Sequence, residues 1–146
     1  MTLTIKVPHK QVIAKVNSFV DKEIKELVEL LNTFDDVITF ESCQGRDHEP
    51  AFIMFNYGID NEFTFDRAIS FAKKLVASIS EAIRESGCGF LGEGGCPLYG
   101  LRIGIEWDGD MKYPYINIYM RFDEIKGVTK SFYRVKEIFD NEYKHI

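Results

Sequence analysis

The residues best suited to chemistry in this chain lie together in the segment Ser42-Cys43-Gln44-Gly45-Arg46. This segment combines a thiol, a carboxamide and a guanidinium at a glycine turn. A strand that ends in glycine can present several backbone N–H groups in a concave arrangement, and an arginine adds a planar fork of donors for a carboxylate or phosphate. We therefore predict a pocket for a small anionic ligand, lined by Ser42, Cys43, Gln44, Gly45 and Arg46.

The same segment also has a structural interpretation, in which Cys43 packs in the core, Gly45 permits the turn and Arg46 is solvated. In the functional interpretation Arg46 holds the anionic group and Gln44 orients a polar one. We expect Cys43 to pack rather than react, because a nucleophilic thiol needs a neighbouring base. The nearest histidine, His48, is near only along the chain.

Three other patterns carry chemistry in other proteins. One is a set of zinc-type ligands from distant loops, Cys43, His48, Cys88 and Cys96. It lacks the Cys-x2-Cys spacing of zinc knuckles. Another is the acidic set Glu106, Asp108 and Asp110, which a hairpin turn explains equally well. We predict no metal site.

The third pattern is the segment Gly87–Gly92, which matches the dinucleotide-binding spacing G-x-G-x-x-G. That fingerprint must follow a strand and open a helix, whereas this segment follows a predicted helix and leads to a predicted strand. We instead predict a loop over Gly87–Gly95 that can close over the Ser42–Arg46 turn.

Three short motifs follow one another between Val20 and Arg46. They are Val20-Asp21, Leu31-Asn32 and Thr39-Phe40-Glu41-Ser42-Cys43-Gln44-Gly45-Arg46. Over residues 20–46 this order resembles the amino-terminal part of the wybutosine-synthesising methyltransferase family, with Gln44 in place of the usual serine. The resemblance implies S-adenosylmethionine-dependent methylation of a modified guanosine in tRNA, on a fold other than the usual methyltransferase one. It maps the family motif onto Thr39, Ser42, Cys43, Gly45 and Arg46.

Composition sets the broad class. A chain of 146 residues fits a single domain, residues 1–146, with one core. The formal net charge of -5 does not favour binding to nucleic acid or to an anionic membrane. No apolar run is long enough to span a bilayer, and residues 1–6 lack the pattern of a secretory signal, so we predict a cytoplasmic protein. We expect all three cysteines to be reduced thiols.

Hydrophobic periodicity predicts helices and strands in alternation. Spacings of three and four residues predict a first helix from Ser18 that ends at the turn Asn32–Asp36, a second over about 65–86 and a third from 131 onward, the first capped by Ser18 or Asp21. Strands are predicted at 37–43, 51–57, 99–107 and 115–122, with a further edge strand at 3–7. The order (β)αββαββα, with hairpins followed by helices, predicts an α+β fold with a mostly antiparallel sheet and helices packed on one face.

The last two predicted strands carry one apolar face and one face of polar or small residues. That second face can be solvated, form a subunit interface or line a pocket.

The sequence supports two hypotheses of function. The first is a ligand-binding protein with its pocket at Ser42–Arg46, in its most specific form an S-adenosylmethionine-dependent methyltransferase. The alternative is a non-enzymatic homo-oligomeric or protein-interaction domain that uses the face of Tyr115, Tyr119 and Arg121, since tyrosine and arginine are favoured at interfaces.

Overall fold

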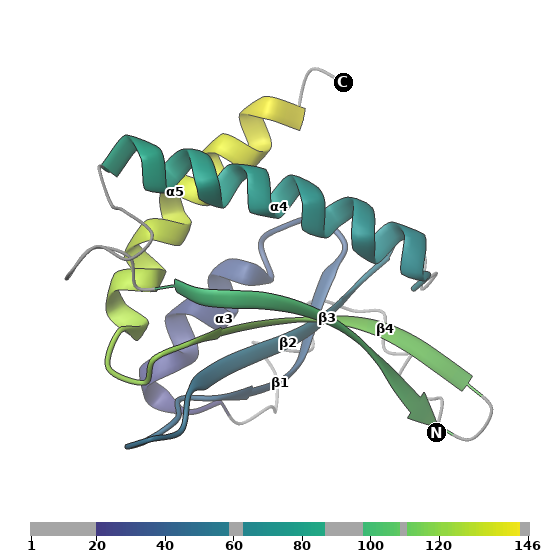
Figure 1. Cartoon of the computed structure of the whole chain (residues 1–146), viewed down its shortest axis with the longest axis horizontal. Coiled ribbons are helices and arrows are strands. Elements are labelled where there is room, and N and C mark those ends of the chain that lie inside the picture. The colour runs from purple at the N-terminus through teal and green to yellow at the C-terminus, as the bar shows by residue number, and fades with distance from the viewer. Residues whose placement is uncertain (1–19, 59–62, 87–97, 109–110, 144–146) are drawn as a thin grey trace.

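The computed structural model describes residues 20–58, 63–86, 98–108 and 111–143 (Figure 1). Its elements in chain order are the 3-10 turn η1 (Lys22–Ile24), α3 (Lys25–Leu31), β1 (Val37–Cys43), β2 (Ala51–Tyr57), α4 (Phe65–Ser86), β3 (Leu98–Asp108), β4 (Met111–Met120) and α5 (Ile125–Tyr143). The fold is α+β, and the predicted order αββαββα is confirmed. The predicted strand at 3–7 and the predicted loop at 87–95 lie outside the described residues.

The four strands form one antiparallel sheet in the order β1-β2-β4-β3. β1 and β2 are neighbours, as predicted, and β3 pairs with β4. The pairing of β2 with β4, which joins the two hairpins, places Phe52 opposite Tyr119 and Met54 opposite Asn117. The two hairpins are thus joined through their second strands, and β1 and β3 lie at the edges.

Helices cover one face of the sheet (Figure 1). α4 packs on β2 and β4, α3 packs beside β1, and α5 lies against both helices. The side chains that alternate toward this face are buried with the apolar stripes of the helices. They include Ile53, Phe55, Ile116, Ile118 and Met120. Strand period two and helix period 3.6 therefore converge on one core.

Two helix starts differ from the sequence expectation. α5 begins at Ile125, six residues before the predicted start near 131, and its first turns bury Ile125 and Val128. Gly127 and Thr129 are weak helix formers that obscured this start, although the Thr129 hydroxyl donates to the Ile125 carbonyl at 2.7 Å. At the first helical region, where Asp21 was one of the two predicted caps, the Asp21 side chain makes no capping hydrogen bond at the start of η1.

The opposite face of the sheet, here called the open face, carries no helix among the described residues. The sequence predicted β2 to be buried on both faces, yet Phe52, Met54 and Asn56 on the open face are only half-buried. The open face of β4 presents Tyr115, Asn117 and Tyr119. This face, rather than the helix-covered one, is accessible to a ligand.

Candidate functional site

The predicted segment forms the end of β1 and the start of the turn that leads to β2. Its backbone donors are engaged within the protein. The Gln44 N–H donates to Asp21 Oδ2 at 2.9 Å, the Gly45 N–H to Cys43 Sγ at 3.4 Å, and the Arg46 N–H to the Glu49 carbonyl at 3.2 Å. These contacts hold the turn and use the donors that an anion would need.

Thr39 and Gln44 bind to the first helical region. Thr39 is buried, and the Asn32 carboxamide brackets it, donating from Nδ2 to Thr39 Oγ1 at 2.9 Å and accepting the Thr39 N–H at 3.3 Å. Gln44 Oε1 accepts the Glu23 N–H at 3.1 Å. The Asp21 carboxylate, expected at a helix cap, instead fixes the turn. Parts of the motif at 20–46 therefore meet in space as one structural unit.

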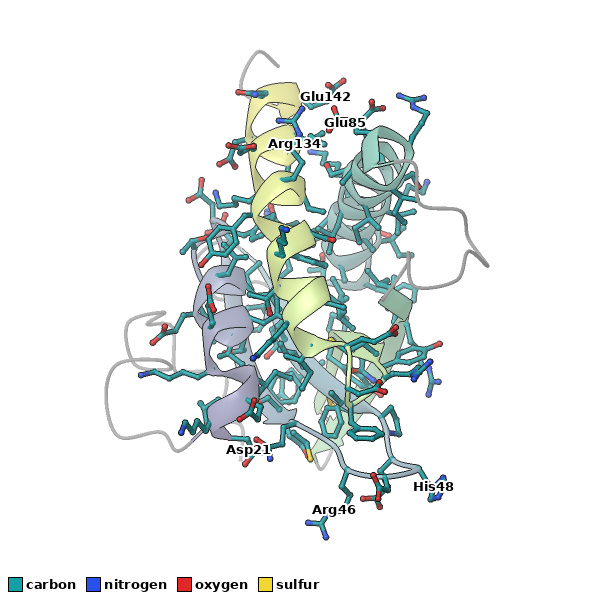
Figure 2. The ribbon with its side chains drawn as sticks, turned by 90° about the vertical axis from the view of Figure 1, so that its left-hand side faces the viewer. Asp21, Arg46, His48, Glu85, Arg134 and Glu142 are labelled. Carbon is teal, nitrogen blue, oxygen red and sulfur yellow. The ribbon has the colours of Figure 1, made fainter. Side chains whose placement is uncertain are left out.

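Gly45 and Arg46 have different surroundings. Gly45 has φ +73, and an added Cβ would lie 2.7–2.8 Å from the backbone of Glu49, Pro50 and Ala51, so only glycine fits. The Arg46 side chain is 84% exposed, with Nε 3.7 Å from Glu49 Oε1. Figure 2 shows Arg46 and His48 projecting from the end of the molecule into solvent. Ser42 and Cys43 are half-buried.

Two hollows flank the turn. The smaller, of about 210 Å³, is the one that Gln44 and Gly45 line, together with Glu23, Asp123 and the start of α5. The larger has a volume of about 480 Å³, within the range of small-molecule sites. Its lining begins two residues after Arg46 and comprises His48, Glu49, Pro50, Phe52, Arg102, Asn117, Tyr119, Arg121 and Phe122. We call it the open-face pocket.

Asn117 stands out among the lining residues. It is 8% exposed, and its Oδ1 atom is buried without a hydrogen-bond partner. An unsatisfied buried polar group costs about 1–3 kcal/mol. Asn117 lines the open-face pocket, but its Oδ1 atom exposes almost no surface, so a ligand donor reaches it only after the side chain turns toward the pocket.

Arg102 is held over the pocket by a chain of contacts. Gly100 lies opposite Tyr119 in the β3–β4 pair, and an added Cβ there would be 2.7 Å from Tyr119 Oη, so the glycine leaves room for the ring. The Arg102 guanidinium lies 5.0 Å from the centre of that ring. Cation–π attraction thus orients Arg102 across β4.

The charges around the open-face pocket favour an anion. Arg121 forms a fork with Asp123, at 3.1 and 2.8 Å, and the Glu49 carboxylate lies near Arg46. Within the described part of the chain Arg102 forms no ion pair with a carboxylate. A ligand carboxylate or phosphate at this position can therefore pair with Arg102.

His48 has a backbone conformation that few side chains adopt. Its φ of 67° lies in the left-handed region, which costs a residue with a Cβ about 1–2 kcal/mol relative to glycine. Histidine is tolerated there more readily than most residues, and Asp36, distant in sequence, shares the conformation with φ 63°. His48 lines the open-face pocket, as Asn117 does.

Other candidate sites have little support in the described ranges. No cluster of three histidine, cysteine or acidic residues there could hold a metal ion. Cys88, Cys96 and Asp110, which two of the sequence patterns require, fall outside those ranges. None of the helices there is both long and apolar enough to cross a membrane.

Comparisons with known proteins do not assign this chain to a family, so its function is argued from the site. The chain matches no protein-family model, no curated protein and no solved structure. The class that can be stated is an α+β protein with a four-stranded antiparallel sheet, helices on one face and, on the other, a pocket lined by both aromatic and polar side chains.

Sequence reasoning placed the site at the turn and missed Asn117 and Arg102 as partners. The sequence signal that could have indicated these two residues is the alternation of apolar with polar or small residues in β3 and β4. This alternation predicted a polar face but did not show whether that face is solvated, forms an interface or lines a pocket. The arginine and asparagine lie directly opposite each other in the β3–β4 register, although 15 residues separate them in sequence. Strand pairing, which the sequence did not reveal residue by residue, brings them together.

Proposed function

We propose that this protein binds a small anionic ligand in the open-face pocket, beside the Ser42–Arg46 turn. The observation that carries this function is the buried, unpartnered Oδ1 of Asn117 at a pocket that also contains Arg102. A ligand N–H or O–H donates to Asn117, and its carboxylate or phosphate pairs with Arg102.

The aromatic side chains define the shape of the ligand. Phe52 and Tyr119 lie opposite each other in the β2–β4 pair, and Phe122 lines the same pocket with 37% of its surface exposed. Flat rings pack well against such side chains. The ligand is therefore a compact molecule with a planar ring, at least one hydrogen-bond donor and one anionic group.

S-adenosylmethionine, a molecule of net positive charge whose carboxylate is its anionic group, is the most specific ligand proposed, and the resemblance over residues 20–46 supports it. Its adenine amino group can donate to Asn117, and its carboxylate can pair with Arg102. The cofactor supplies an activated methyl group when bound. In methyl transfer these residues would bind and orient it, with the second substrate entering from the open face.

Amide NMR spectra recorded during a titration test where a ligand binds. S-adenosylmethionine and adenosine 5′-monophosphate serve as probes, since they share the adenine ring and differ in the anionic group. We expect the resonances of His48–Phe52, Arg102 and Asn117–Phe122 to move for at least one probe. Shifts confined to Glu23, Gln44 and Lys126 would move the site to the smaller hollow and contradict the assignment.

Thermal denaturation with millimolar S-adenosylmethionine tests the methyltransferase form separately. A ligand that binds only the native state must raise the melting temperature. If adenosine 5′-monophosphate stabilises the protein and S-adenosylmethionine does not, ligand binding stands and methyl transfer is excluded.

The alternative function is a homo-oligomeric or protein-interaction domain that uses Tyr115, Tyr119 and Arg121. The flat packing of the two tyrosines supports this alternative, because Tyr115 lies over Gly104 and Tyr119 over Gly100. If Tyr119→Ala abolishes self-association and no probe binds, this alternative replaces ligand binding.

A further inference from the structure

Among the described strands, β3 lies at one edge of the sheet and pairs on one side only. The strand runs from Leu98 to Asp108 and pairs on one side with β4, and no other described strand pairs with it. It has 11 residues, the longest strand of the sheet. An unpaired edge of this length offers a template for another strand, and proteins usually protect such edges.

The centre of β3 carries few of the features that protect edge strands. Inward-pointing charges and prolines are two such features, and residues 101–105 contain no proline and no charge on the helix-covered face. Leu101, Ile103 and Ile105 alternate on the helix-covered face. The charged Arg102 points from the open face, where its guanidinium lies over the Tyr119 ring of β4.

The apolar stripe of β3 also extends beyond the helices. α4 packs on β2 and β4, and Leu101 and Ile103 are only partly buried against the core. Ile105 is 46% exposed. In Figure 1 the paired ends of β3 and β4 extend to the lower right, away from α4. An additional strand beside β3 would pair its outward backbone groups and bury the flank of this stripe against cross-strand neighbours.

We infer that the partner of this edge is β3 of a second copy, paired antiparallel about a two-fold axis at Ile103. This register is self-complementary. On the helix-covered face it places Ile103 opposite itself and Leu101 opposite Ile105, so that apolar side chains meet as cross-strand pairs. On the open face it places Arg102 opposite Gly104, so that the two arginines do not face each other.

The resulting dimer has a continuous eight-stranded sheet, twice the 4-stranded sheet of one copy. Each interface is isologous, as expected for the commonest symmetric dimers. The open-face pocket stays accessible because Arg102 lies over β4. Self-association through this edge is therefore independent of ligand binding. It also differs from association through the face of Tyr115, Tyr119 and Arg121.

Sedimentation equilibrium tests the interface with two matched variants. Ile105→Lys puts a charge opposite Leu101 of the second copy, and Val76→Lys makes the same change at an equally exposed residue of α4, 45% against 46%. We expect a wild-type dimer, a loss of affinity of about tenfold or more for Ile105→Lys, and no change for Val76→Lys. Melting curves verify that both variants fold.

A cysteine pair tests the register in a background with the three native cysteines replaced by serine. Residues directly opposite in an antiparallel pair have Cα atoms about 4.5–5.5 Å apart, within disulfide range. Ile103→Cys should give a covalent dimer on oxidation. Leu101→Cys should not, because its own copy lies four residues away along the partner strand.

Three results would overturn the assignment. The first is a wild-type monomer at all concentrations, as expected if another segment of the same chain covers the edge. The second is a dimer that Ile105→Lys leaves unchanged. The third is rapid cross-linking through Leu101→Cys with none through Ile103→Cys, which would contradict the register.

Discussion

Asn117 of the open-face pocket carries a cost that packing does not explain, because it is buried with an unpartnered oxygen. The left-handed backbone of His48 belongs to the Arg46–Glu49 turn, which two backbone hydrogen bonds close. Sites where a local rule is broken without compensation are commonly functional. The two residues come from different elements, the turn after β1 and strand β4, and meet at one pocket.

Asn117→Leu removes the unsatisfied oxygen while keeping the branched shape of the side chain. We expect the free energy of unfolding to stay unchanged or rise by about 1 kcal/mol, because the buried polar group has no partner to lose. Chemical denaturation measures the change. Asn32→Leu is the matched control, and it should lose about 1–3 kcal/mol because Asn32 bonds to Thr39 and to the Val28 carbonyl. Equal losses for the two variants would show that Asn117 is structural.

His48→Gly removes the strain of a left-handed backbone conformation in the folded state, but it also increases the conformational entropy of the unfolded chain. These effects nearly cancel, so we expect stability within about 1 kcal/mol of wild type. The affinity for a bound probe, measured by calorimetry, should fall. An unchanged affinity would limit His48 to a turn residue.

At the scale of elements, the Ser42–Arg46 turn joins η1, β1 and β2. Asp21 and Glu23 from the first helical region bind Gln44, while Gly45 permits a close approach of the backbone to Glu49 and Pro50. The turn thus sets where His48–Pro50 form one wall of the open-face pocket.

Gly45→Ala should cost about 1–3 kcal/mol, since its φ is positive and the atoms that a Cβ would meet are all backbone. Gly127→Ala, in the exposed first turn of α5, should instead stabilise the protein slightly, by about 0.5 kcal/mol. Urea denaturation of both variants compares them. A neutral effect of Gly45→Ala would indicate that the turn can move.

The elements themselves were largely predictable. Val37–Cys43 and Ala51–Tyr57 match their predicted bounds, because β-branched and aromatic runs between turn residues leave little ambiguity. The start of α5 was not predictable, since Gly127 and Thr129 conceal it. The joining of the two hairpins through β2 and β4 depends on contacts between residues far apart in sequence, and periodicity carries no information about it.

At the scale of the whole molecule, an ion-pair fork joins the two long helices. Arg134 of α5 donates to both carboxylate oxygens of Glu85 of α4, at 2.7 and 2.8 Å (Figure 2). The hydrogen bond from Arg134 lowers the pKa of the Glu85 carboxyl below its ordinary value. The fork lies at the end of the molecule opposite the turn, as the labelled residues in Figure 2 show.

Glu85→Gln should lower the melting temperature slightly at neutral pH, as is usual for a partly exposed ion pair. Because the folded-state pKa is depressed, this stabilisation is present above the unfolded pKa and disappears as pH falls through the folded one. The difference in melting temperature between wild type and Glu85→Gln should therefore disappear at acidic pH. Glu142→Gln, on the same end of α5, is the control and should give little difference at either pH. A difference that persists in acid would contradict an ionic origin.

Ligand binding at Asn117 is tested most directly by the shift in melting temperature that each probe causes, measured in parallel for wild type and Asn117→Leu. The probes are S-adenosylmethionine, adenosine 5′-monophosphate and inorganic phosphate at millimolar concentration. At least one adenine-containing probe should stabilise the wild type and leave the variant unchanged. No shift with any probe, or equal shifts in both proteins, would contradict a binding role for Asn117.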